Sequence, residues 1–147
     1  MHNAGKNSLK LDVSGFEEYI QKLEKLEANV KPIVEDALNQ AGETITDDTF
    51  DAVSDSNLPR GGEYSTGKTR ESIIKNPRIK WSGTTAEIGV GFDFAKPGAG
   101  GYLITGTPRM APDKALNKIY KSKKYMKDIQ KDMIDIFQDE ISRRMGG

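Results

Sequence analysis

The chain has 147 residues, a formal net charge of zero, one histidine and no cysteine. This length favours a single domain, residues 1–147, and is too short for a doubly wound nucleotide hydrolase. Without cysteine, and with His2 as its only histidine, the chain has no disulfide framework, no Cys/His metal site and no Ser-His or Cys-His nucleophile. No segment is apolar enough to span a bilayer, so we expect a protein made in a reducing cytoplasm. Because these catalytic and metal-binding residue types are missing, we also expect no enzymatic activity and no cofactor.

The N-terminal third is predicted to be mainly helical. Alternating apolar residues around Leu11, in an N-terminal arm formed by residues 1–13, predict a short edge strand. Ser14 and Glu17 have the spacing of a capping box, so a helix is expected to begin there. Pro32 is tolerated in the first turn of a helix, so we expect a kink or a restart near residues 29–32 and a second helix up to about residue 54.

A long loop is predicted next, over residues 55–68, which are rich in Gly, Pro, Ser and Asn. We expect it to be flexible and to order only on docking. Its sequence GEYSTGKT at residues 62–69 satisfies the phosphate-binding pattern GxxxxGK(S/T). A phosphate-binding loop needs a buried strand in front of its glycines, whereas residues 55–61 are polar and contain Pro59. We therefore predict no nucleotide site, against the hypothesis of an enzyme with Lys68 and Thr69 at a phosphate.

A β-hairpin is predicted after Pro77, because apolar residues alternate with polar ones on both sides of the turn sequence SGTT at residues 82–85. Trp81 shares a face with Ile79, so core packing is favoured over a role as a partner-binding anchor. Gly89 and Gly91 fall on the opposite face, where we expect another backbone or helix to approach closely. A second flexible loop over residues 95–101 and a short strand at residues 102–107 follow.

The C-terminal third is predicted to be helical. Pro112 fits the first turn of a helix through Leu116 and Ile119, and a longer amphipathic helix with Met126 and Met133 on its apolar side runs to the final glycines. The order of elements contains no β-α-β alternation. It therefore predicts an α+β fold, in which a small antiparallel sheet, the hairpin plus one or two further strands, packs against the long N-terminal helical region and the C-terminal helices.

Charge is unevenly divided along the chain. Residues 1–55 carry 5 basic and 12 acidic side chains, whereas residues 56–147 carry 17 basic and 10 acidic ones. These side chains form either two solvated helix faces or a head-to-tail contact between copies, acid against base. The second interpretation predicts a subunit interface between Asp47, Asp48, Asp51 and Asp55 of one copy and Lys118, Lys121, Lys124 and Lys127 of the next.

Three segments carry a resemblance to a known family: TGKTRESI at residues 66–73, YLITGT at residues 102–107 and PRMAPDKA at residues 108–115. They resemble the neck or tail-completion family of tailed bacteriophages, also called head-tail joining or minor tail proteins, whose members carry a TGxLRxSI segment and a later YxxxxEFGT…P…PFLxxA segment. The chain departs from these patterns at Thr69, in place of leucine, at Ile104, in place of an acid, and at Asp113, in place of an aromatic residue.

The resemblance implies a structural virion protein of a phage or prophage, assembled in the cytoplasm of the bacterial host. Such proteins form a hexameric or dodecameric ring at the head-tail junction and bind head-closure or connector proteins and tail-terminator or tail-tube proteins, with DNA only as the passing genome. Thr66, Gly67 and Gly106 would then form structural turns, and Met110 is a candidate contact to a neighbouring protein.

A nucleic-acid-binding module is the alternative. The lysines between residues 114 and 127 would contact phosphates, and Tyr120 and Tyr125 would stack on bases. Zero net charge weighs against this hypothesis.

Overall fold

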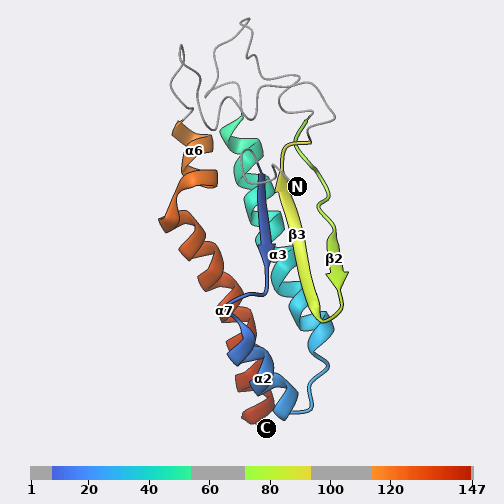
Figure 1. Ribbon diagram of the computed structural model, residues 1–147. Helices are drawn as coiled ribbons and strands as arrows, with labels where there is room; N and C mark the ends of the chain where they lie inside the picture. Colours follow the sequence, from blue (N-terminus) through green and yellow to red (C-terminus); the bar gives the residue numbers. More distant parts are fainter. Residues whose placement is uncertain (1–7, 54–71, 94–113, 147) are drawn as a thin grey trace, which may run out of the picture.

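A computed structural model describes residues 8–53, 72–93 and 114–146 and has an α+β fold, as predicted. Figure 1 shows an elongated molecule in which two long antiparallel helices run along its length beside a small sheet. The elements in chain order are β1 (Ser8–Asp12), α2 (Glu17–Lys25), α3 (Val30–Ala52), β2 (Ile79–Ser82), β3 (Thr85–Gly91), α6 (Lys114–Lys121) and α7 (Lys123–Met145).

The sheet is antiparallel, with the strand order β1-β3-β2. The predicted hairpin is confirmed as β2 and β3, and the predicted N-terminal strand is confirmed as β1 at the edge of the sheet. Leu11 of β1 and Ile79 of β2 both pair with Ile88 of β3, which forms one apolar row across the sheet. Gly83 turns the chain between β2 and β3 with φ +64°, a value that glycine adopts without strain.

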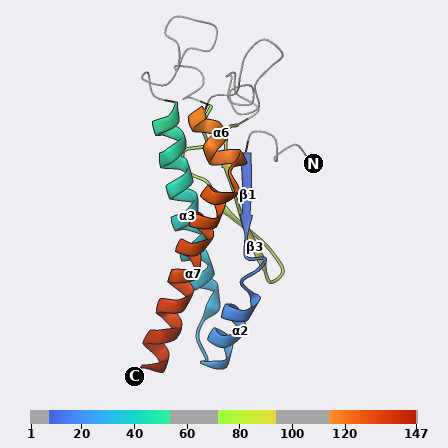
Figure 2. The same cartoon turned by 90° about the vertical axis from the view of Figure 1, so that its left-hand side faces the viewer.

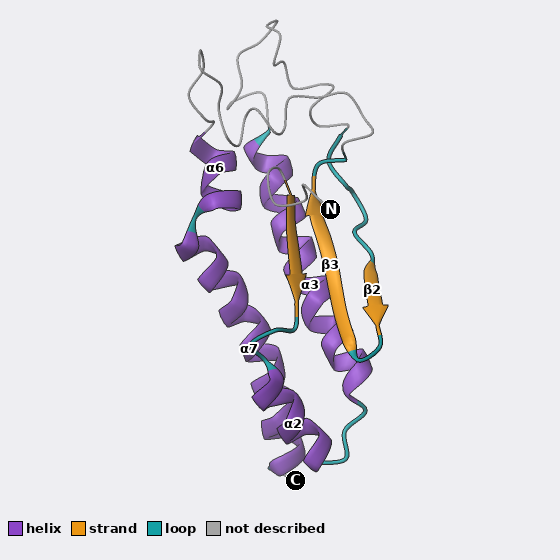
Figure 3. Cartoon of the chain, viewed as in Figure 1, coloured by secondary structure: helices purple, strands orange, loops and turns teal. Residues whose placement is uncertain are grey.

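The helices lie on one face of this sheet. Helix α3 contacts the sheet mainly through β3, and α7 packs along α3 and α2. Figures 2 and 3 show α3 and α7 side by side over most of their length, with α2 at the end where α7 finishes. The ring of Phe137 in α7 contacts two aromatic rings at the start of α2. Its centroid lies 5.5 Å from that of Phe16, which is tilted against it, and 6.2 Å from that of Tyr19, which stacks on it. The predicted positions of Met126 and Met133 on the packed side of the last helix are confirmed.

The start of α2 differs from the prediction. Ser14 was expected to cap the helix, but the helix begins at Glu17, Phe16 is the N-cap and no side chain caps it. The carboxylate of Glu17 instead accepts a hydrogen bond from the backbone N–H of Gly15 at 2.9 Å, and this bond holds the pKa of Glu17 below its usual value. Neither half of the predicted capping box forms, because Ser14 lies in the turn that leaves β1, where its N–H donates to Asp12 instead of Glu17.

The restart predicted near Pro32 is confirmed. Helix α2 ends at Lys25, and α3 begins at Val30 with Pro32 in its first turn, where no intrahelical N–H bond is lost. The end of α3 at Ala52 agrees with the prediction of a helix to about residue 54.

Close approach between helix and sheet occurs at Gly42, and the prediction for Gly89 is wrong. A Cβ atom on Gly42 would lie 2.9 Å from Ile88 Cδ1 and 3.6 Å from Val90 Cγ1, so the missing side chain lets α3 lie close to β3. A Cβ atom on Gly89 would meet nothing within 4 Å. The strand pattern placed Gly89 correctly on the face opposite Ile88 and Val90, but the helix packs on the face that those two side chains form.

The described residues that flank residues 54–71 and 94–113 lie together at one end of the molecule. Val53, Ser72, Asp93 and Lys114 all lie at the end where α3 finishes and α6 begins (Figure 1). The loops expected over residues 55–68 and 95–101, the strand expected at residues 102–107, and Pro112 lie outside the described residues. Among the helices that the structure describes, none has the length and apolar character needed to cross a membrane.

Candidate assembly site

The last residues of the segment TGKTRESI are anchored in the body of the protein. Ser72 and Ile73 are both buried, and Ile73 forms an antiparallel bridge with Phe92, just after β3. The N–H of Ile74 donates to the carbonyl of Gly91 at 2.8 Å, and the N–H of Asp93 donates to the carbonyl of Ser72 at 2.7 Å. The end of this segment therefore extends the sheet beyond β3.

The end of the segment PRMAPDKA enters the same apolar cluster from α6. Ala115 packs against the core, and Leu116, the next residue, is fully buried. One turn later, the ring of Tyr120 lies 6.2 Å from that of Phe92. The fold thus brings the described ends of two family-like segments, 42 positions apart in the sequence at Ile73 and Ala115, into one apolar core, in which Phe92 contacts both Ile73 and Tyr120 of α6.

A buried hydrogen bond joins α6 to α3 beneath this cluster. The Tyr120 hydroxyl lies 2.6 Å from Thr49 Oγ1, which itself lies 2.7 Å from the carbonyl of Ile45. Because the threonine hydroxyl has one proton and the carbonyl can only accept, Tyr120 donates to Thr49 and Thr49 donates to Ile45. Burial raises the pKa of Tyr120 to about 12, although the bond to Thr49 partly opposes this shift.

A second hydrogen bond joins α7 to α3. The Tyr125 hydroxyl donates to Asp48 Oδ2 at 2.6 Å. Ser122, which caps α7, accepts from the Tyr125 N–H at 3.2 Å and holds this tyrosine in the first turn. Burial, and then the neighbouring Asp48 carboxylate, raise the pKa of Tyr125. The acidic end of α3 is therefore bonded to the α6–α7 region of the same chain.

The residues of the predicted subunit interface lie at this end of a single copy. Asp47 and Asp51 are exposed on the last turns of α3, while Asp48 is half-buried against Tyr125. On the neighbouring helices, Lys118 and Lys121 of α6 and Lys124 and Lys127 of α7 are exposed. Asp55, Thr66, Gly67, Gly106 and Met110 lie outside the described residues.

Base stacking by the two tyrosines, expected under the nucleic-acid hypothesis, does not fit this geometry. Tyr120 is only 7% exposed, and its ring packs on Phe92. Tyr125 is half-buried and its hydroxyl is bonded to Asp48. The lysines around them remain available for phosphate contacts, but the aromatic part of a single-strand binding surface is absent at these two positions.

Trp81 packs against the core, as predicted. Its indole N–H donates to Glu35 Oε2 at 2.8 Å, and Lys31 Nζ lies 5.3 Å from the centre of the ring. Both partners come from the first two turns of α3, so the half-buried tryptophan ties β2 to the beginning of that helix.

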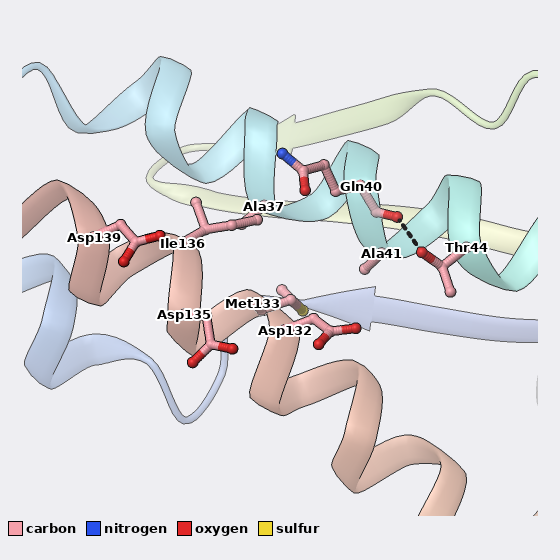
Figure 4. Close-up of a pocket in the computed structure, with 9 residues that line it drawn as sticks. All are labelled: Ala37, Gln40, Ala41, Thr44, Asp132, Met133, Asp135, Ile136 and Asp139. Carbon is pink, nitrogen blue, oxygen red and sulfur yellow. Dashed lines mark hydrogen bonds between the residues drawn. The ribbon is translucent and has the colours of Figure 1, made fainter.

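A groove between α3 and α7 was not predicted. Its volume is about 240 Å³ and its floor is apolar, since Ala37 and Ala41 of α3 face Met133 and Ile136 of α7 (Figure 4). Its rim is polar and is formed by Gln40, Thr44, Asp132, Asp135 and Asp139. The signal was present in the sequence, because Asp128, Asp132, Asp135 and Asp139 recur at spacings of four, three and four residues and so share one side of a helix.

Comparisons of the chain with protein-family models, with curated proteins and with solved structures find no significant match.

Proposed function

We propose that the protein is a structural component of a tailed phage or prophage virion, which completes the tail or neck by forming a ring at the head-tail junction. The observation that carries this proposal is the resemblance of three sequence segments, which follow one another in the family's order at residues 66–73, 102–107 and 108–115, to the tail-completion family. Its partners would be further copies of itself and the head-closure and tail-terminator or tail-tube proteins, with the genome only passing by.

The fold is compatible with this proposal. Ile73, in the first family-like segment, forms a bridge with Phe92, and α6, which begins at the end of the last segment, packs on Phe92 through Tyr120. A body of two long helices and a sheet holds these described residues in place, which suits a subunit that must keep one shape within a ring.

Reconstitution of infectious particles tests the proposal. The phage or prophage that encodes the chain is given an early stop codon in this gene, and purified protein is added to the resulting lysate. We expect the mutant lysate to contain heads and tails that do not join, and the added protein to restore the infectious titre in proportion to its concentration. A stop-codon mutant that yields a normal titre, or unjoined parts that the protein does not rescue, would exclude this function.

A further inference from the structure

Helix α7 has two oppositely charged flanks on either side of its buried stripe. The stripe is formed by Ile129, Met133 and Phe137. With about 100° of rotation per residue, the exposed aspartates fall on one half of the exposed face of α7 and the exposed lysines on the other half, and the two groups adjoin opposite the stripe. The acidic flank consists of Asp128, Asp132, Asp135 and Asp139, and the basic flank consists of Lys123, Lys124, Lys127 and Lys131.

The acidic flank faces α3 and forms the rim of the α3–α7 groove, as Figure 4 shows for three of its members. By the same rotation, the basic flank lies on the side of α7 away from α3, and none of its lysines lines the groove that α7 forms with α3. The residues that line the groove include three carboxylates and no lysine or arginine. Among the described residues, none of the eight flank side chains takes part in an ion pair.

A single metal ion is a poor partner for this row of aspartates. Among the described residues there is no group of three His, Cys, Asp or Glu side chains that could hold one metal ion. A row of lysines fits better, because their ammonium groups would reach successive carboxylates while their apolar stems lie on the alanine and methionine floor.

We infer that the acidic flank and the groove of one copy bind the basic flank of α7 of a second copy. The partner is chosen by charge complementarity within the chain itself. Because the acidic and basic flanks are separate surfaces of α7, a copy that binds through its acidic flank keeps its basic flank free for the next copy, and the contact is heterologous, acidic flank to basic flank. A contact of this kind, repeated around an axis, generates a ring. The inference deepens the proposed function and rests on it for the closure of the ring.

Charge reversal on each flank tests the inference. The acidic-flank variant carries Asp132→Lys and Asp139→Lys, two exposed positions on the groove rim. The basic-flank variant carries Lys127→Glu and Lys131→Glu, also at exposed positions. A control variant with Glu18→Lys and Glu24→Lys makes the same change in net charge as the acidic-flank variant, but on exposed residues of α2. Urea unfolding confirms that each variant is folded.

Self-association is measured by sedimentation velocity over a range of protein concentrations at low salt. We expect each flank variant alone to need about tenfold or more protein for half-assembly, because attraction is replaced by repulsion at both positions. An equimolar mixture of the two flank variants should assemble again, since one variant then has two basic flanks and the other has two acidic flanks. The control should assemble like the unmodified chain.

Three results would overturn the inference: an unmodified chain that stays monomeric at every concentration, a flank variant that assembles like the unmodified chain, or a mixture that assembles no better than its components. The proposed function is judged separately, by adding the same variants to the stop-codon lysate. Flank variants that restore the titre as well as the unmodified chain would leave the function standing and remove this interface from it.

Discussion

The hydroxyls of Tyr120 and Tyr125 fix how α6 and α7 lie against the end of α3. Each donates to an α3 side chain one residue apart, Thr49 and Asp48, at 2.6 Å. Helical spacing marks both tyrosines as part of a packed face, so their burial could be predicted from the sequence. Their partners could not, because they lie 71 and 77 positions away in the chain, and no local pattern connects residues at such separations.

The buried Thr49–Tyr120 pair predicts an asymmetry between two conservative substitutions. Tyr120→Phe should lower the free energy of unfolding by about 0.5–1.5 kcal/mol, because Thr49 keeps its bond to Ile45. Thr49→Val should lower it by about 1–3 kcal/mol, since the Tyr120 hydroxyl is then buried without an acceptor. Urea denaturation of both variants and of the double variant measures these values.

The double variant is the control for this cycle. With both hydroxyls gone, it should be less destabilised than the sum of the single variants. Equal costs for the two single variants that add in the double variant would show that the hydrogen bond contributes nothing to the stability.

The raised pKa of Tyr120 predicts a loss of stability at alkaline pH. The tyrosine ionises at about pH 10 in the unfolded chain but only at about 12 in the folded one. The contribution of Tyr120 to the free energy of unfolding is therefore complete below pH 10. It falls by about 1.4 kcal/mol per pH unit as the pH rises from 10 to 12. Unfolding of the unmodified chain and of Tyr120→Phe should be compared at about pH 9 and about pH 11, because the two proteins share every other ionisable group. The unmodified chain should have the higher free energy of unfolding at about pH 9, and this difference from Tyr120→Phe should vanish at about pH 11. A difference that persists unchanged would contradict the raised pKa of Tyr120.

At the scale of the elements, the contact between α3 and the sheet is decided by Gly42. Because the atom nearest to an added Cβ is the flexible end of Ile88, Gly42→Ala should change the free energy of unfolding little, the gain in helix propensity offsetting the crowding. Ile88→Val removes that end and should cost about 0.5–1.5 kcal/mol. Adding Gly42→Ala to Ile88→Val should then recover about 0.5–1 kcal/mol.

Gly42→Leu serves as the contrasting change, because a large side chain cannot fit between α3 and β3; we expect it to cost about 1–3 kcal/mol or more. Thermal unfolding of the four variants measures these changes in stability. If Gly42→Leu is as stable as Gly42→Ala, helix and sheet are not in close contact at this position.

Local signals were sufficient for most of the elements. Alternation predicted β1 and the hairpin, and Pro32 predicted the break between α2 and α3, because each signal acts within a few residues. The capping box at Ser14 failed since the turn after β1 already uses the Ser14 backbone. The role of Gly42 was missed because a glycine within a helical pattern gives no sign of what it faces across the core.

For the whole molecule, the charge division predicts an assembly that depends on salt. Attraction between exposed charged surfaces is screened beyond about 8–10 Å at moderate ionic strength. The protein concentration at half-assembly should therefore rise between about 50 and about 500 mM salt. Light scattering across this range measures the change. An assembly that is unchanged or strengthened at high salt would show that apolar burial dominates the contact between copies.

Two acidic surfaces are candidates for binding the lysines of a neighbouring copy. The sequence predicted the end of α3, with Asp47, Asp48, Asp51 and Asp55, because the acidic residues are densest there. The fold places the described members of this set beside α6 and α7 of their own chain, and Tyr125 already binds Asp48. This arrangement could not be read from the sequence, which shows the acidic and basic halves as separate but not as neighbours in space.

The last prediction separates these two surfaces. Asp47→Lys with Asp51→Lys makes the same change in net charge as Asp132→Lys with Asp139→Lys, so long-range repulsion between copies is matched. Among the described residues, α3 contacts α6 and α7 of the same copy, which carry exposed lysines. The helical neighbours of Asp132 at three and four positions are two aspartates and two isoleucines. We therefore expect the α7 variant to raise the protein concentration at half-assembly several-fold more than the α3 variant does. The opposite order, with both variants shown to be folded by urea unfolding, would return the interface to the end of α3.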